Sequence, residues 1–151
     1  MSDNPTGPNP LKLIGRATRT FTRIADLELR DLGFATGQLP VLIGLKGGKA
    51  LSQAELARIA QVEQPSMAQL LNRMERDGLV ERIPDPADKR SRLISLTTVA
   101  TKRMPKAKAF MEARTAKALA GFTPQDVAQL VDLLLRLNEN LDRMGADGSK
   151  E

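Results

Sequence analysis

The sequence predicts a mainly α-helical protein with one small β-hairpin. Two observations predict this fold class. Along most of the 151 residues, apolar side chains recur at spacings of three and four, which is the period of an amphipathic helix. Only residues 79–83 and 92–96 are short runs rich in Val, Ile and Leu, and the polar run 84–91 separates them. That pattern is typical of a hairpin with a long loop.

The N-terminal part of the chain predicts an arm followed by two helices. Residues 1–10 are rich in Pro, Asn and Gly and have no apolar periodicity, so we expect a flexible arm. A helix follows over 11–32, with Gly33 as its C-cap, and a second helix follows over 36–45. The expected core face of the second helix consists of Leu39, Leu42 and Ile43.

The middle of the chain predicts two helices in close succession. Ser52 and Glu55 form a capping-box sequence, in which each side chain satisfies a backbone N–H at the start of a helix. We expect this helix to end near residue 60. After a short break, a helix over 64–76 carries Pro65 in its first turn, where proline is well tolerated. Its expected inward face consists of Met67, Leu70, Leu71 and Met74.

The C-terminal part predicts two further helices and a flexible tail. Residues 97–120 have helical periodicity, and Thr123 is the expected N-cap of a helix that ends at residue 144. Residues 145–151 form the expected tail. Apolar residues of the last helix alternate in steps of three and four, as in a short heptad seam. They are Val127, Leu130, Leu134, Leu137, Leu141 and Met144.

Composition limits the chemistry that the chain can perform. It contains no Cys, His, Tyr or Trp, which excludes disulfides and thiolate sites and removes the commonest acid–base and metal-ligand side chain. We therefore expect no enzyme activity, no metal site and no cofactor. No apolar run approaches the roughly 20 residues that cross a bilayer, and the N-terminus does not resemble a signal peptide. We expect a cytoplasmic protein with no membrane partner.

The charge balance favours a polyanionic partner. There are 23 Lys and Arg residues against 18 Asp and Glu residues, a net charge of +5. A basic surface of this kind suits nucleic acid, although a generally soluble basic surface explains the charge equally well.

The order of elements in residues 50–97 is that of a winged helix-turn-helix, with the wing at 84–91. In this arrangement the second helix enters the major groove of duplex DNA with its N-terminal residues at base edges. For that helix alone, a solvated polar face is an equally good interpretation. Residues 52–78 hold three basic and four acidic residues, so the wing must supply the electrostatic attraction. The expected DNA-binding residues are Ser52, Gln64, Pro65, Ser66, Gln69, Arg73, Asp88, Lys89, Arg90 and Arg92.

Two segments resemble a known family. The run DPADKRSRLISLT, residues 85–97, is similar to the wing signature of the MarR family of bacterial regulators. The runs SQAELARIA and VEQPSMAQLLNRMERDGLVER resemble the reading-head helices of that family, and EQPS resembles its SlyA-like branch. The resemblance covers residues 11–144, which we therefore expect to form a single domain.

The resemblance implies roles for individual residues. Arg90 would enter the minor groove, Asp88 would orient the Arg90 guanidinium, and residues 64–73 would read bases. Residues 11–46 and 98–144 would form a helical dimerisation region. Its expected contact residues are Ile14, Ala17, Phe21, Val127, Leu130, Leu134, Leu137 and Leu141.

The sequence departs from the family pattern at three positions. Ala87 replaces a frequent basic residue, Gln69 replaces an Arg of SlyA-like proteins, and Ala100 replaces a frequent Gly. The first two departures mean that the operator sequence cannot be copied from relatives.

The function that the resemblance implies is sequence-specific transcription regulation. A homodimer would bind a pseudo-palindromic operator in double-stranded DNA, with half-sites about 10 bp apart, as a repressor. A small anionic or aromatic effector would relieve repression, bound near Arg16, Phe21, Arg23 and Phe34. For the stripe Arg16, Arg19 and Arg23, a solvated or DNA-facing surface is the alternative.

A second function fits the same composition. A non-specific architectural protein would coat DNA with the basic wing and the basic helix around residues 102–117, without reading its sequence. Preference for one site over random DNA would separate the two functions.

Overall fold

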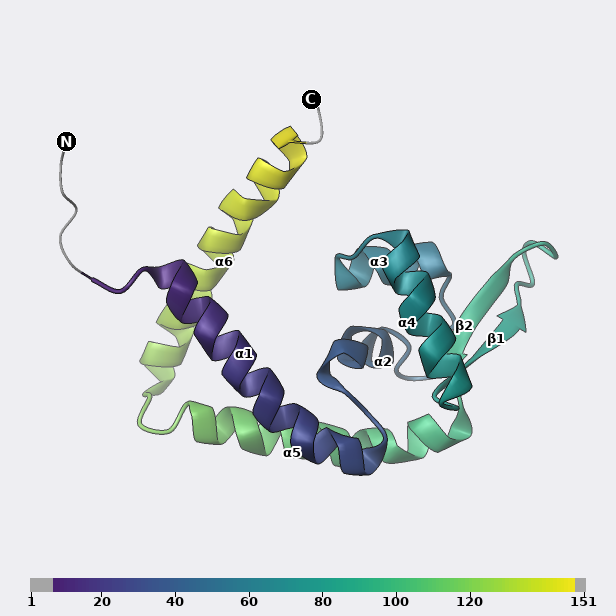
Figure 1. The fold of residues 1–151 in the computed structure, drawn as a ribbon, viewed down its shortest axis with the longest axis horizontal. Helices are drawn as coiled ribbons and strands as arrows, with labels where there is room; N and C mark the ends of the chain where they lie inside the picture. The colour runs from purple at the N-terminus through teal and green to yellow at the C-terminus, as the bar shows by residue number, and fades with distance from the viewer. Residues whose placement is uncertain (1–6, 149–151) are drawn as a thin grey trace. The chain divides into compact units, whose positions relative to one another are not determined.

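The computed structural model describes residues 7–148, which form six α-helices, two 3-10 helices and one two-stranded hairpin (Figure 1). The chain divides into two compact units, the first ending at Met111 and the second starting at Glu112. The boundary falls within the helix α5, Thr98–Ala118. This architecture confirms the predicted fold class.

The first helix, α1, spans Pro10–Leu29 and continues into the 3-10 helix η1, Arg30–Leu32. It starts one residue earlier than predicted, because Asn9 is its N-cap and Pro10 fits the first turn. Assigning residue 10 to a flexible arm was therefore wrong, and residues 1–6 of that arm lie outside the described residues.

Gly33 ends this helical segment as the sequence predicted. Its φ of 78° is in the left-handed region that glycine adopts without strain. A Cβ at this position would lie 2.9 Å from Nη1 of Arg103, which donates a hydrogen bond to the carbonyl oxygen of Leu32 at 3.4 Å. Any other residue would therefore meet both backbone strain and a neighbouring side chain.

The predicted helix 36–45 is divided. The 3-10 helix η2, Thr36–Gln38, precedes the α-helix α2, Leu39–Gly44. The N–H of Thr36 donates to Oδ1 of Asp26 at 2.7 Å, a contact from ten residues away that local sequence cannot show. The predicted core face was partly wrong, because Ile43 is 62% exposed whereas Val41 and Leu45 are buried.

Helices α3, Gln53–Ala60, and α4, Gln64–Arg76, match the prediction. The capping box is formed: the N–H of Ser52 donates to the Glu55 carboxylate at 2.8 Å, and the N–H of Glu55 donates to the Ser52 hydroxyl at 3.1 Å. Gln61 adopts a φ of 54°, which turns the chain sharply between the two helices. The result is a helix-turn-helix.

Strands β1, Val80–Pro84, and β2, Arg92–Leu96, form the antiparallel hairpin. Pro84 pairs with Arg92, so the turn covers 85–91 and is one residue shorter than predicted. Leu79 is not part of the strand, because its N–H donates to the Met74 carbonyl and closes the end of α4. Ile94 also exchanges two backbone hydrogen bonds with Leu51, which ties the hairpin to the segment before α3.

All of the buried apolar residues described belong to the first unit. Three of the four predicted inward residues of α4 are fully buried, and the fourth, Leu70, is half-buried and packs against this core. The core consists of Ala25, Leu29, Phe34, Val41, Leu42, Leu45, Leu56, Ala57, Met67, Leu71, Met74, Leu79, Val80, Ile94, Ala100 and Ala107.

The second unit contains the end of α5 and the helix α6, Pro124–Gly148. Thr123 caps α6 as predicted: its hydroxyl accepts a hydrogen bond from the N–H of Asp126 at 3.1 Å. The helix extends four residues beyond the predicted end, so residues 145–148 are helical and not part of a tail. Residues 149–151 lie outside the described part of the chain.

Candidate nucleic-acid interface

One face of α4 presents polar side chains away from the core. Ser66, Gln69 and Arg73 are exposed, whereas Met67 and Leu71 are buried on the other side of the helix. At 3.6 residues per turn, the three polar residues lie within an arc of about 60°. This arrangement supports their predicted use as one contact surface, which we call the reading face.

Gln64 does not belong to the reading face, although the sequence placed it there. Helical geometry turns it to the opposite side of the first turn, and Pro65 is exposed beside it. Nε2 of Gln53 donates to Oε1 of Gln64 at 3.4 Å and lies 3.5 Å from its backbone oxygen. Gln53 was not among the expected DNA-binding residues.

Ser52 has a structural role in the helix start. Its half-buried hydroxyl accepts the hydrogen bond from Glu55 N–H, as the capping box requires. The hydroxyl hydrogen still leaves one donor for a further partner.

The wing turn is folded by its own backbone and carboxylates. Oδ1 of Asp85 accepts from the N–H of Ala87 at 2.9 Å, and Oδ1 of Asp88 accepts from the N–H of Arg90 at 3.0 Å. The N–H of Asp85 donates to the Ser91 carbonyl at 3.2 Å, and the N–H of Ser91 donates to the Asp88 carbonyl at 3.0 Å. These Asx turns give the exposed loop a defined conformation.

The implied role of Asp88 as the partner of the Arg90 guanidinium was wrong in this structure. The carboxylate of Asp88 orients the backbone N–H of Arg90, as an Asx turn does, and not its side chain. In the described part of the chain, no ion pair involves Lys89, Arg90 or Arg92, and all three are exposed. The turn and the first residue of β2 therefore leave three cations exposed.

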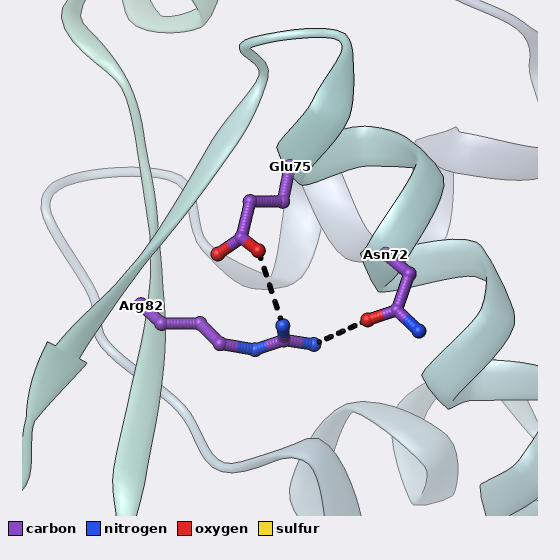
Figure 2. Close-up of polar contacts among 3 residues, drawn as sticks. All are labelled: Asn72, Glu75 and Arg82. Atoms are coloured by element: carbon purple, nitrogen blue, oxygen red, sulfur yellow. Dashed lines mark hydrogen bonds and ion pairs between the residues drawn. The ribbon is translucent and has the colours of Figure 1, made fainter.

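Arg82 of β1 reaches α4, as Figure 2 shows. Its Nη1 lies 3.3 Å from Oε1 of Glu75, and its Nη2 donates to Oδ1 of Asn72 at 3.0 Å. Arg82 was not among the expected DNA-binding residues. The signal available in the sequence was a cation at an inward position of a strand.

The predicted effector site is not assembled as expected. Phe34 is only 3% exposed and belongs to the buried core. Arg16 and Arg23 are exposed, and Phe21 is half-buried. A shallow hollow lies elsewhere, at the turn between α3 and α4, and is lined by Ala54, Ala57, Arg58, Gln61, Val62, Glu63 and Gln64.

The apolar face of α6 is exposed to solvent in the single chain. None of its described residues is buried, and its exposed apolar positions go beyond the predicted seam. Val127, Leu134 and Leu137 are half-buried, as are Ile14 and Phe21 of α1, whereas Ala17 is exposed. The exposed large apolar residues of α6 are Leu130, Val131, Leu133, Leu135, Leu141 and Met144.

The described residues contain no cluster of three or more acidic side chains placed to hold a metal ion. Between residues 7 and 148, no helix combines the length and apolarity that a membrane span requires.

The chain is similar to known transcriptional regulators along most of its length. The MarR family model matches residues 31–91, which include α2, α3, α4, β1 and the wing turn. The uncharacterized HTH-type transcriptional regulator YybA of Bacillus subtilis (strain 168) is 27% identical over 133 residues, 88% of this chain and 89% of that protein.

Solved structures share the fold. The transcriptional regulator SlyA superposes with a TM-score of 0.82 at 24% identity, covering 90% of this chain and 96% of that one. The transcriptional regulator PA3341 has a TM-score of 0.73 at 29% identity over 87% and 97% of the two chains. A mutant MarR from E. coli, complexed with operator DNA, has a TM-score of 0.76 at 25% identity over 83% and 91%. The family model over the helix-turn-helix, the similarity beyond it and the shared fold support a MarR-family regulator.

Proposed function

We propose that this protein is a DNA-binding transcription regulator that recognises a specific duplex site as a homodimer. One observation carries the proposal: a single unit presents the polar reading face of α4 together with a preformed turn that bears Lys89 and Arg90, with Arg92 at the start of β2 beside them. A mutant MarR from E. coli that shares this fold was solved in complex with operator DNA, which supports DNA binding by this chain.

The side chains of the reading face suit direct readout of bases. A Gln amide can both donate to and accept from adenine, and Ser and Arg can bond to several base edges or phosphates. The core-facing side of α4 is fully packed, which holds these side chains on a rigid element. The reading face can therefore discriminate bases, while the wing cations contact the backbone or the narrow minor groove.

Homodimer formation is supported by the surface of α6. Viewed down the helix axis at 100° per residue, the apolar side chains of α6 form an arc that covers about half of the circumference. Leu133 lies at one edge of this arc and Leu135 at the other. A face of this width is larger than scattered surface residues require and indicates a protein partner. A second copy of the chain is the partner that also gives a twofold-symmetric operator with half-sites one helical turn apart.

We further propose that the dimer represses transcription and that a small aromatic carboxylate releases it. The exposed guanidinium groups of Arg16 and Arg23 lie on one stripe of α1 and provide the counter-charge for such a ligand, whereas half-buried Phe21 lies on another side of the helix. Phe34 has no part in this site because it lies in the core. Titration of operator complexes with benzoate, in the wild type and in Arg16→Ala/Arg23→Ala, tests this step.

The deciding experiment is selection from a randomised duplex library, followed by competition at physiological salt. We expect the selected site to bind about a thousandfold or more tightly than scrambled duplex. The double variant Ser66→Ala/Gln69→Ala should lose most of that preference, whereas Gln129→Ala, an exposed Gln on α6, should keep it. Equal affinity for all duplexes would instead identify a non-specific architectural protein.

A further inference from the structure

Arg82 occupies an inward-facing position of β1. Side chains alternate between the two faces of a strand, so Arg82 shares its face with Val80, which is 2% exposed, and Glu81 points the other way to solvent. A cation on an inward face is costly unless hydrogen-bond partners compensate for its lost hydration. Its partners therefore show what the position is used for.

Both partners of Arg82 lie on α4 (Figure 2). Nη1 lies 3.3 Å from Oε1 of Glu75 and Nη2 lies 3.0 Å from Oδ1 of Asn72. Residues three apart are neighbours on one flank of a helix. The planar guanidinium therefore spans one turn of α4 with two separate bonds, which a lysine could not do.

The flank that Arg82 holds lies between the core and the reading face. At 100° per residue, Asn72 and Glu75 follow the buried Leu71 around the helix and precede Gln69 of the reading face. Two bonds to this flank restrain the rotation of α4 about its axis relative to β1. Since β1 continues directly into the wing turn, the same contact relates the reading face to the wing cations.

The pair is too exposed for its main effect to be stability. The side chains of Arg82 and Glu75 are 28% and 44% exposed, and ion pairs of this kind contribute little to folding. Its value is geometric, because it adds two polar contacts between elements that are also joined by buried apolar side chains and by the short connection at residues 77–79.

We propose that Arg82 is a positioning residue that fixes the angle between α4 and the hairpin, so that the reading face and the wing cations engage DNA together. The effect on DNA binding rests on the proposed function. The contact between Arg82 and α4 exists in the free protein, and the first test is made on the free protein.

The first test measures residual dipolar couplings of backbone N–H groups in the full-length protein. In the wild type, couplings from α4 and from the hairpin should fit one alignment tensor. In Arg82→Gln, the hairpin couplings should shrink and fit a different tensor, while Arg82→Lys should lie between the two. Arg136→Gln, which breaks the exposed pair with Asp132 at 3.9 Å on α6, is the matched control and should change neither set.

The second test measures how much the wing contributes to binding of the selected site. With Arg82 present, Arg90→Ala should weaken binding about tenfold or more. In the Arg82→Gln background, Arg90→Ala should weaken binding less than about threefold. A wing that is no longer held relative to α4 contributes little to binding, so removing the Arg90 side chain removes little affinity. A merely structural role of Arg82 would lower affinity and leave the Arg90 effect unchanged.

The outcomes separate this inference from the proposed function. Unchanged couplings in Arg82→Gln, or an unchanged Arg90 effect, would overturn the positioning role. An Arg82→Gln variant whose salt slope falls by about 1.8, one contact in each subunit, with the Arg90 effect intact, would identify a direct phosphate contact instead. If Arg82→Gln alters the couplings but the wild type binds no specific duplex, the positioning role of Arg82 stands and the proposed function is rejected.

Discussion

In the wing turn, the aspartates act on the backbone and the basic residues remain available. Opposite charges two residues apart made an ion pair between Asp88 and Arg90 a reasonable expectation. An Asx turn requires less ordering, because a short carboxylate reaches the N–H two residues ahead without fixing a long side chain. The structure contains that turn, with Oδ1 of Asp88 3.0 Å from the N–H of Arg90.

A pair of substitutions at Asp88 distinguishes the two roles. Asp88→Asn keeps the turn, because an amide oxygen also accepts from the Arg90 N–H, and it removes a negative charge near phosphates. We expect its affinity for the selected site to equal or exceed that of the wild type. Asp88→Ala loses the bond and should bind about fivefold more weakly. If Asn and Ala weaken binding equally, the charge of Asp88 orients the Arg90 guanidinium after all.

Arg90 and Gln69 should contribute to recognition in different ways. Arg90→Ala should weaken binding in proportion to the A·T content of the flanking minor groove and leave half-site base preferences intact. Gln69→Ala should relax preference at one or two symmetric positions, at a cost of about 1–3 kcal/mol for each lost contact. Selection from a randomised operator library measures both, with circular dichroism to confirm folding. The reverse pattern would mean that α4 is not the recognition helix.

Gln53 should have no effect on base preference, although it contacts α4. Its amide donates to Oε1 of Gln64, which lies on the side of α4 opposite to the reading face. Gln53→Ala should therefore leave the base preferences unchanged in selection from a randomised operator library. Gln125→Ala, an exposed Gln on α6, is the control. A changed preference at one base-pair position per half-site would mean that Gln64 reads a base.

At the scale of elements, the sequence predicted the helices whose ends are marked by capping residues or by a proline in the first turn. The capping box of Ser52 and Glu55, the proline at the start of α4 and the cap at Thr123 placed three helices. The division into η2 and α2 was not predictable, because Asp26 of α1 satisfies the N–H of Thr36 from outside the segment. The bond between Arg82 and α4 is likewise tertiary, and periodicity does not reveal it.

The end of α6 shows a second limit of local reasoning. Apolar periodicity predicted an end at residue 144, yet the helix continues to Gly148 through residues without an apolar pattern. Periodicity reports which face is apolar and not where hydrogen bonding stops. The heptad pattern predicted the seam but not Val131, Leu133 and Leu135, which widen the exposed apolar face.

The exposed face of α6 should determine the oligomeric state. Placing charges in its seam with Leu134→Glu/Leu137→Glu should give monomers, because buried carboxylates without partners are strongly unfavourable. Sizing chromatography with light scattering measures this, and operator binding should be lost with the dimer. Gln125→Glu/Gln129→Glu adds the same charges to the polar face and should remain dimeric. Unchanged dimers of the Leu variant would reject the seam as the interface.

At the scale of the whole molecule, charge and core are distributed differently. The buried core lies in the first unit, which carries the helix-turn-helix and the wing, whereas α6 contributes no buried residue. The whole chain has a net charge of +5, but residues 52–78 hold three basic and four acidic residues. Attraction to a polyanion must therefore come from outside the two central helices, above all from the wing turn.

This distribution predicts how binding responds to salt. Each phosphate neutralised by a cation releases condensed counterions, so the logarithm of the binding constant should fall by about 0.9 per phosphate for each log unit of salt. A dimer that places Lys89, Arg90 and Arg92 of both subunits on DNA should therefore show a slope of several units. Fluorescence anisotropy between 50 and 300 mM salt, a range of about 0.8 log units, measures this slope.

Two variants test the source of the slope. Arg92→Ala should reduce it by about 1.8, one contact in each subunit. Gln69→Ala should lower affinity and leave the slope unchanged, because a neutral amide releases no counterions. A slope near zero in the wild type would mean that the wing does not contact phosphates.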